Sequence, residues 1–287
     1  MELWNTETEI KFFEETLKSI GSPEKLFYKL NSEYYAYIPK SVKGDGKTLQ
    51  SRNSPIGKFT EKWTKDLFAP IAKEFGLYAV NGVICEEIGL SKRSNADLAF
   101  CKSNNVNQKH EDIKIIFEIK MSIVSNYKLK PQNRIEYVGD YKSHKGNPSL
   151  LRSDSMLKAI GKSINIRVSG KESAKIPIII LGNSPITESY STKVDLLKTA
   201  GVIQGFLSLY PNPTESDHIQ NTSKNGFQTI ENIDTLKNLC SDFLEEELTY
   251  FSSMLTKTRL GELIRISNRE KSDEEKAEKF LNMIREV

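Results

Sequence analysis

The sequence predicts an α/β fold in which a mixed β-sheet is flanked by helices, with additional helices at both ends of the chain. Three observations predict it. Residues 113–123 form a β-branched run typical of a central strand. Residues 176–181 (IPIIIL) are apolar throughout, as expected of a fully buried strand. Segments with helical apolar periods lie before, between and after these runs, and this order favours a sheet covered by helices.

The N-terminal region, residues 1–53, is expected to contain helices and a basic loop. Apolar residues recur at three- and four-residue intervals over 8–20 and stop before Gly21, which predicts an amphipathic helix with a glycine stop. A second short helix is expected after Pro23. Residues 40–53 contain glycines, bases and small polar residues without an apolar period, so they are predicted to form a loop.

The central region, residues 54–210, is expected to hold the sheet. Its first helix opens after Ser54-Pro55 and runs to about Ala69, and Pro70 should end or kink it. Besides the two runs above, strands are expected where the sequence alternates or is rich in Val and Ile, and helices where the apolar period is three to four. The expected strands are 77–88, 97–102 and 202–209, and the expected helices are 153–165 and 192–200.

The C-terminal region, residues 211–287, is expected to be mostly helical from residue 230 onward and to form one compact unit with the centre. Apolar residues follow a helical stripe from Ile233 to Phe251. Ser272 and Glu275 have the spacing of a capping box, which predicts the start of a final helix.

Composition narrows the class of protein. Hydrophobic residues make up 38% of the chain and charged residues 28%, which predicts a globular protein with a large core. No apolar stretch approaches the roughly 18 residues that span a bilayer, and acids stand near the start where a secretion signal carries bases, so we expect a cytoplasmic protein without a membrane partner. Three scattered cysteines and three scattered histidines argue against a disulfide framework, a zinc site or histidine catalysis. A net charge of +3 neither demands nor excludes nucleic acid.

A pair of opposite charges interrupts the apolar run 113–123. Residues two apart in a strand point to the same face, so Glu118 and Lys120 are aimed at one point. If the polar loop 103–112 closes a hairpin, Asp97 lies as far before its centre as Glu118 lies after it, and the two carboxylates face each other. The alternative is a solvated strand face with an ordinary Glu–Lys pair.

Two facing carboxylates repel each other unless positive charge lies between them. A divalent cation supplies such charge, and hard oxygen ligands select Mg²⁺, with Mn²⁺ as a substitute. The main-chain carbonyl of Ile119 could complete the ligands given by Asp97 and Glu118. Such an ion activates water and neutralises charge on a phosphate, while Lys120 can hold the attacking water, so this set predicts phosphodiester hydrolysis.

The spacing of Asp97 and the sequence Glu118-Ile119-Lys120 resembles the D…(D/E)xK signature of the PD-(D/E)xK nuclease superfamily, which includes many type II restriction endonucleases. Ala96 stands where that family often has Pro. The order of expected elements from about 54 to 209 resembles the family core and implies a restriction-endonuclease-like sheet. The family pattern also places an acidic helix before the motif, which implies an active-site role for Glu61. Plain solvent exposure is the alternative for Glu61, and Glu86 and Glu87 compete for the same role.

Basic and amide side chains follow the FEIK strand closely and predict contacts to DNA phosphates and base edges, although a solvated loop is an equally good interpretation. A second basic loop and one side of the helix 153–165 offer further candidates, also open to interpretation as plain surface. The DNA-binding candidates are Lys128, Lys130, Gln132, Asn133, Arg134, Lys142 and Lys145 in the first loop, Lys43, Lys47 and Arg52 in the second, and Lys158 and Lys162 on the helix.

The sequence therefore predicts a type II restriction endonuclease that hydrolyses both strands of double-stranded DNA with Mg²⁺. A palindromic target implies a homodimer, for which the C-terminal helices could build the interface. A restriction system also implies a cognate DNA methyltransferase. A repair or recombination nuclease, or a noncatalytic DNA-binding protein, are the alternatives.

Overall fold

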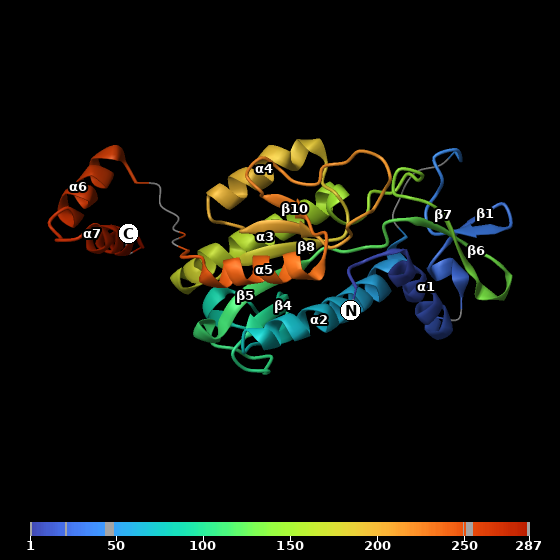
Figure 1. Cartoon of the computed structure of the whole chain (residues 1–287), viewed down its shortest axis with the longest axis horizontal. Helices are drawn as coiled ribbons and strands as arrows, with labels where there is room; N and C mark the ends of the chain where they lie inside the picture. Colours follow the sequence, from blue (N-terminus) through green and yellow to red (C-terminus); the bar gives the residue numbers. More distant parts are fainter. Residues whose placement is uncertain (1, 21, 44–48, 249, 251–254, 286–287) are drawn as a thin grey trace.

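The computed structural model describes residues 2–20, 22–43, 49–248, 250 and 255–285. Within them lie seven α-helices and two β-sheets, one of six strands and one of four (Figure 1). The α/β class predicted from the sequence is confirmed. None of the helices in these ranges combines the length and apolar character needed to cross a bilayer.

The six-stranded sheet is mixed and has the order β10-β9-β8-β5-β4-β3. Its first three strands in the chain pair antiparallel, and the last three join in parallel. Most of its residues are buried, since helices cover both faces. The strands are β3 (Tyr78–Val83), β4 (Ala96–Cys101), β5 (Ile113–Ile119), β8 (Ile178–Gly182), β9 (Gly205–Ser208) and β10 (Phe227–Thr229).

Each face of this sheet has its own hydrophobic core because side chains alternate along a strand. On one face, Leu98 and Phe117 pack with apolar residues of α1 (Thr6–Ile20), α2 (Asn53–Glu74) and α5 (Ile233–Glu245). On the other, Ala99 and Ile116 pack under α3 (Ser153–Ser169) and α4 (Glu188–Thr199). The second face is the one toward which Asp97 and Glu118 also point.

The helix α2 is longer than the sequence predicts. Pro70 lies inside it, and the helix continues to Glu74, so the expected end at Pro70 was wrong. Pro70 is exposed, so water can satisfy the carbonyl that lacks its N–H partner, while Ile71 and Ala72 beside it are buried in the core and hold the last turn in place.

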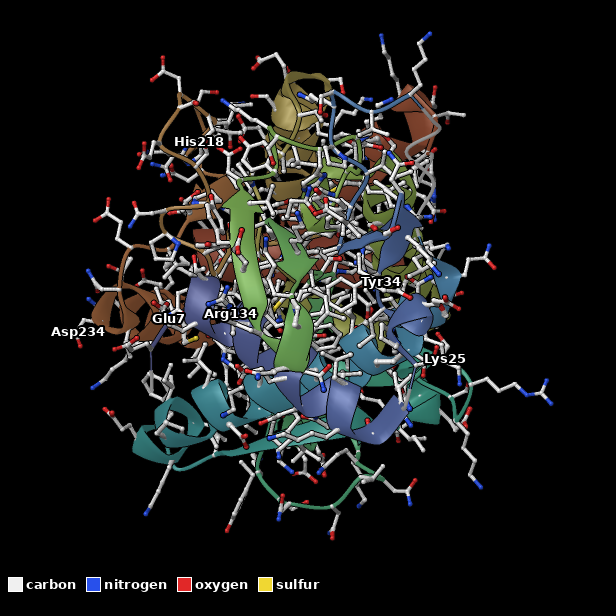
Figure 2. The ribbon with its side chains drawn as sticks, turned by 90° about the vertical axis from the view of Figure 1, so that its right-hand side faces the viewer. Glu7, Lys25, Tyr34, Arg134, His218 and Asp234 are labelled. Atoms are coloured by element: carbon white, nitrogen blue, oxygen red, sulfur yellow. The ribbon has the colours of Figure 1, made fainter. Side chains whose placement is uncertain are left out.

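A second sheet of four short antiparallel strands follows the order β1-β2-β6-β7. It brings residues near 30 beside residues near 130, and it forms the end of the molecule that faces the viewer in Figure 2, where Tyr34 and Arg134 are labelled. The prediction of one continuous loop over 128–145 was therefore wrong. The strands are β1 (Tyr28–Leu30), β2 (Glu33–Tyr35), β6 (Asn126–Leu129) and β7 (Ile135–Gly139).

Short 3-10 helices connect these elements, and the expected helix after Pro23 is one of them. They span Pro23–Lys25, Gln50–Arg52, Glu86–Ile88, His110–Asp112, Pro131–Asn133, Ser149–Leu151 and Lys171–Lys175.

The chain ends in a helical hairpin of α6 (Lys257–Ser267) and α7 (Asp273–Arg285), which pack on each other and stand apart from the sheets in Figure 1. The predicted capping box is confirmed, because Ser272 Oγ accepts from Glu275 N and a Glu275 carboxylate oxygen accepts from Ser272 N, both at 3.1 Å. The prediction for Phe251 lies outside the described residues.

Candidate active site

Asp97 and Glu118 face each other because β4 and β5 pair in the predicted register. Leu98 lies opposite Phe117 and Ala99 opposite Ile116. One further step along the same register places Asp97 opposite Glu118. Asp97 Oδ2 also accepts a hydrogen bond of 2.7 Å from the backbone N–H of Ile119, which locks the carboxylate to the end of β5.

The Lys120 ammonium lies among the three predicted ligand oxygens. Its Nζ is 2.5 Å from Glu118 Oε1, 3.2 Å from the Ile119 carbonyl oxygen and 3.9 Å from Asp97 Oδ2. The backbone N–H of Lys120 donates to the Leu181 carbonyl at 2.7 Å and so extends the parallel pairing with β8. The structure thus gathers Asp97, Glu118, Ile119 and Lys120 around one point at the carboxyl end of β5.

Lys162 of α3 completes this group. Its Nζ is 3.4 Å from Asp97 Oδ1 and forms an ion pair with Glu118 Oε2. The helix turns Met156, Ala159 and Ser163 into the core, and Lys162 stands at the border of that buried stripe. From the sequence alone, Lys162 is predicted only as a DNA contact or as plain surface. We call Asp97, Glu118, Lys120 and Lys162 the charged cluster.

The surroundings in the charged cluster disfavour the ionised form of Glu118 and favour the ionised form of Lys162. Burial, and then the charge of Asp97, raise the pKa of Glu118. Burial disfavours the charged form of Lys162, but the nearby Glu118 and Asp97 carboxylates outweigh it and raise the pKa of this lysine. Lys162 therefore stays charged at neutral pH, and its ammonium lies against both carboxylates, which would otherwise repel each other.

Glu61 lies on α2 near the charged cluster. Burial and the charge of Asp97 raise the pKa of Glu61, with Lys162 and Lys120 acting in the opposite direction. Its side chain is nevertheless exposed, and its backbone carbonyl accepts from Asn81 at 3.0 Å. The competitor Glu87 is occupied elsewhere, because its carboxylate accepts from the backbone and ring of His110.

Two residues that the sequence analysis missed position the chain just after Lys120. Ser149 Oγ donates to the Lys120 carbonyl at 2.7 Å and accepts from Asn183 N at 3.0 Å. The Asn183 side chain bonds both backbone groups of Ser122. The polar Asn183 and Ser184 directly after an apolar strand were the available signal, since such residues at a strand's carboxyl end often support a site.

Several predicted DNA-binding residues turn out to have structural partners. Arg52 is buried, donates to the carbonyls of Leu26 and Ala36, and stacks over the Tyr37 ring at 4.4 Å. It therefore cannot clamp a phosphate as expected, because its guanidinium joins α2 to the strand region before it. Lys43 is exposed, and Lys47 lies outside the described residues.

Most bases expected to form one DNA-binding loop are paired with acids on or near the small sheet. Lys128 forms an ion pair with Glu33, and Glu136 forms ion pairs with Lys130 at 3.4 Å and with Arg134 at 4.0 Å. Gln132, Asn133 and Arg134 are exposed at the turn between β6 and β7.

The remaining candidates lie elsewhere. The Lys142 ammonium donates to the Asp217 carbonyl at 2.7 Å. The backbone N–H of Lys145 donates to the Ile38 carbonyl at 3.0 Å. Lys158 is exposed on α3 and pairs with Asp154 at 3.1 Å. Of the two candidates on that helix, Lys162 is the one that reaches the Asp97 and Glu118 carboxylates.

The oxygens of the charged cluster suit a divalent cation. Asp97, Glu118 and the Ile119 carbonyl already surround a positive group, and all three offer the hard oxygens that Mg²⁺ and Mn²⁺ prefer. Among the described residues, no group of three or more His, Cys, Asp or Glu side chains is placed to share an ion. The predicted ligand set uses two carboxylates and one carbonyl.

The site is thus a largely buried cluster of two acids and two lysines at the carboxyl end of a central strand. Comparisons of the chain with protein-family models, with curated proteins and with solved structures found no match.

Proposed function

We propose that the chain is a Mg²⁺-dependent endodeoxyribonuclease of the PD-(D/E)xK type that hydrolyses double-stranded DNA as a type II restriction endonuclease. The observation that carries the proposal is the position of the Lys120 ammonium among the Asp97, Glu118 and Ile119 oxygens. A solvated strand face gives no reason for these groups to converge. The antiparallel β3-β4-β5 unit, followed by α3 and the parallel strand β8, supports a restriction-endonuclease-like core.

In this proposal Asp97, Glu118 and the Ile119 carbonyl hold one divalent cation. When bound, the ion lowers the pKa of a water molecule and offsets charge on the phosphate. Asp97 is kept in place by the Ile119 N–H. Lys120 has three donors and no acceptor, so it orients the attacking water and stabilises the charge that builds on phosphate oxygens.

Glu61 takes a supporting role, because its charge acts on the site from α2 while its side chain remains accessible to water or ligand. The double-stranded substrate and the paired cuts of a restriction enzyme call for a homodimer. The hairpin α6–α7, with Ile264 44% exposed, is the proposed interface. A cytoplasmic location and a cognate DNA methyltransferase belong to the same proposal.

The test uses supercoiled plasmid and long linear DNA with Mg²⁺. The wild-type chain is expected to produce defined fragments, and Glu118→Ala or Lys120→Ala to lower the cleavage rate by about 1000-fold or more, as loss of a group that stabilises the transition state does. Glu111→Ala is the matched control, because Glu111 is exposed on the turn before β5, and it should cleave like wild type.

Full activity in the Glu118 and Lys120 variants would remove this mechanism. Cutting only at nicks, ends or junctions would point to a repair nuclease instead. Binding of DNA without cleavage, even with Mn²⁺, would leave a DNA-binding protein.

A further inference from the structure

Lys162 has no assigned role in the mechanism above, yet it is held more tightly than an ordinary surface lysine. Its side chain is 17% exposed and lies against both carboxylates of the charged cluster. Lys158, one turn earlier on the same helix, is 70% exposed and pairs with an acid of its own turn. The two lysines share a helix and a residue type, so their difference lies in what they contact.

Placing a nearly buried ammonium is unfavourable unless carboxylates compensate for the lost water. Here Lys120 and Lys162 each pair with one oxygen of Glu118, and Lys162 also lies 3.4 Å from Asp97, so two ammonium groups balance the two facing carboxylates. With Glu61 included, three carboxylates and two ammonium groups leave one net negative charge. One divalent cation and one phosphodiester bring that total to neutrality, whereas a second divalent cation would leave two positive charges uncompensated in a largely buried site.

We propose that Lys162 is a second catalytic lysine whose permanent positive charge takes the place of a second divalent cation, so that the site works with one. The inference rests on the nuclease function proposed above. Lys162 forms no covalent bond in the reaction. It donates hydrogen bonds to a non-bridging oxygen of the scissile phosphate as negative charge builds there.

The reaction balances without a co-reactant other than water. The oxygen of the attacking water forms the new bond to phosphorus and loses one proton. The bond from phosphorus to the leaving ester oxygen breaks, and that oxygen keeps the electron pair and gains one proton. Lys120 orients the water, and Lys162 stabilises the phosphate.

The deciding experiment measures Mn²⁺ binding to the full chain by electron paramagnetic resonance, without DNA, beside plasmid cleavage. Wild type is expected to bind one Mn²⁺ per chain. Lys162→Met should bind Mn²⁺ about tenfold more tightly, because a positive charge beside the carboxylates is gone. The same variant should cleave about 100-fold more slowly, as expected when one charge-stabilising donor is lost. Tighter metal binding with slower cleavage is a combination that a merely structural role would not produce.

Two further variants keep the test sound. Lys158→Met should match wild type in both measurements. Lys162→Arg retains the charge and should keep wild-type Mn²⁺ affinity. Circular dichroism shows whether each variant folds. If Lys162→Met does not fold, Lys162→Gln replaces it and is compared with Lys162→Arg.

Two Mn²⁺ ions per wild-type chain, weaker Mn²⁺ binding in Lys162→Met, or undiminished cleavage by that variant would each overturn the inference. If the wild-type chain cleaves no DNA at all, the nuclease proposal itself fails, and this outcome is distinct from the three others.

Discussion

Two buried carboxylates, Glu9 and Glu118, lie on either side of the same short segment and are held in opposite ways. Glu9 on α1 accepts four hydrogen bonds, from the Trp4 indole, the Tyr127 hydroxyl and two backbone N–H groups of residues 124 and 125. Glu118 at the end of β5 is held by the ammonium groups of two lysines. Burial raises the pKa of both carboxyls, but hydrogen bonds oppose the shift in Glu9 whereas the charge of Asp97 adds to it in Glu118.

The difference separates an acid whose partners are fixed by the fold from one whose partners can be exchanged. Backbone and aromatic donors around Glu9 are fixed by the fold, so its oxygens have no room for a further ligand. Lysine side chains are flexible and can move aside while the carboxylates stay in place. Glu9 therefore anchors the segment that joins the two sheets, and Glu118 remains able to exchange partners.

The largest effect is expected for Glu9→Ala, which should lower the free energy of unfolding by about 4 kcal/mol. Four buried donors lose their acceptor, and each unsatisfied group costs about 1 to 3 kcal/mol, part of which water entering the cavity recovers. Urea unfolding followed by circular dichroism measures the change.

Glu14→Ala on the exposed face of the same helix is the control and should change stability by less than about 0.5 kcal/mol. Equal stability of the two variants would show that the Glu9 hydrogen bonds do not anchor the segment.

The next effect concerns His144, which binds the same segment. Its Nε2 lies 2.9 Å from the Val124 carbonyl and its Nδ1 accepts from Gly146 N at 3.1 Å, so Nε2 carries the proton and the ring is neutral. Burial lowers the pKa of His144 from 6.5 to about 4. Between pH 6.5 and 4 the unfolded chain binds the proton and the folded chain does not. The contribution of the neutral His144 to the free energy of unfolding is therefore complete above pH 6.5 and is lost as the pH falls toward 4.

The loss should reach about 2 to 3 kcal/mol at pH 4, at 1.36 kcal/mol for each unit of pKa difference. His144→Phe keeps the stacking on Tyr37 but cannot titrate, so the difference in stability between wild type and this variant should shrink as pH falls from 6.5 to 4. A difference that stays constant with pH, in unfolding measured across this range, would contradict the assignment.

The sequence predicted every strand of the large sheet except β10, and it placed Asp97 opposite Glu118, because these features depend on local patterns. Apolar runs marked β5 and β8, and the loop centre alone set the register that brings Asp97 to Glu118. The small sheet could not be foreseen in the same way. Its strands have three to five residues, and β2 pairs with β6 across a long stretch of chain, so neither periodicity nor length distinguishes them from loops.

Tertiary contacts also decided the roles of individual bases. Arg52 and Lys162 were both named as DNA contacts from their basic character. Arg52 instead lies over a tyrosine ring in the core, and Lys162 lies between two carboxylates. Which side of a helix or loop meets the protein is set by packing partners distant in sequence, and composition carries no information on them.

The double variant Glu118→Gln with Lys162→Met is expected to show the smallest effect on stability, although its effect on activity should be large. Replacing a buried ion pair by neutral residues of similar size is often neutral or stabilising, because the cost of removing both charges from water disappears together with their attraction. We expect a free energy of unfolding within about 1 kcal/mol of wild type, measured by the urea unfolding used for Glu9→Ala. If the double variant lost as much stability as Glu9→Ala, the charged cluster would be a structural anchor like Glu9. Unchanged stability with lost cleavage would instead mean that these charges are kept for what they bind.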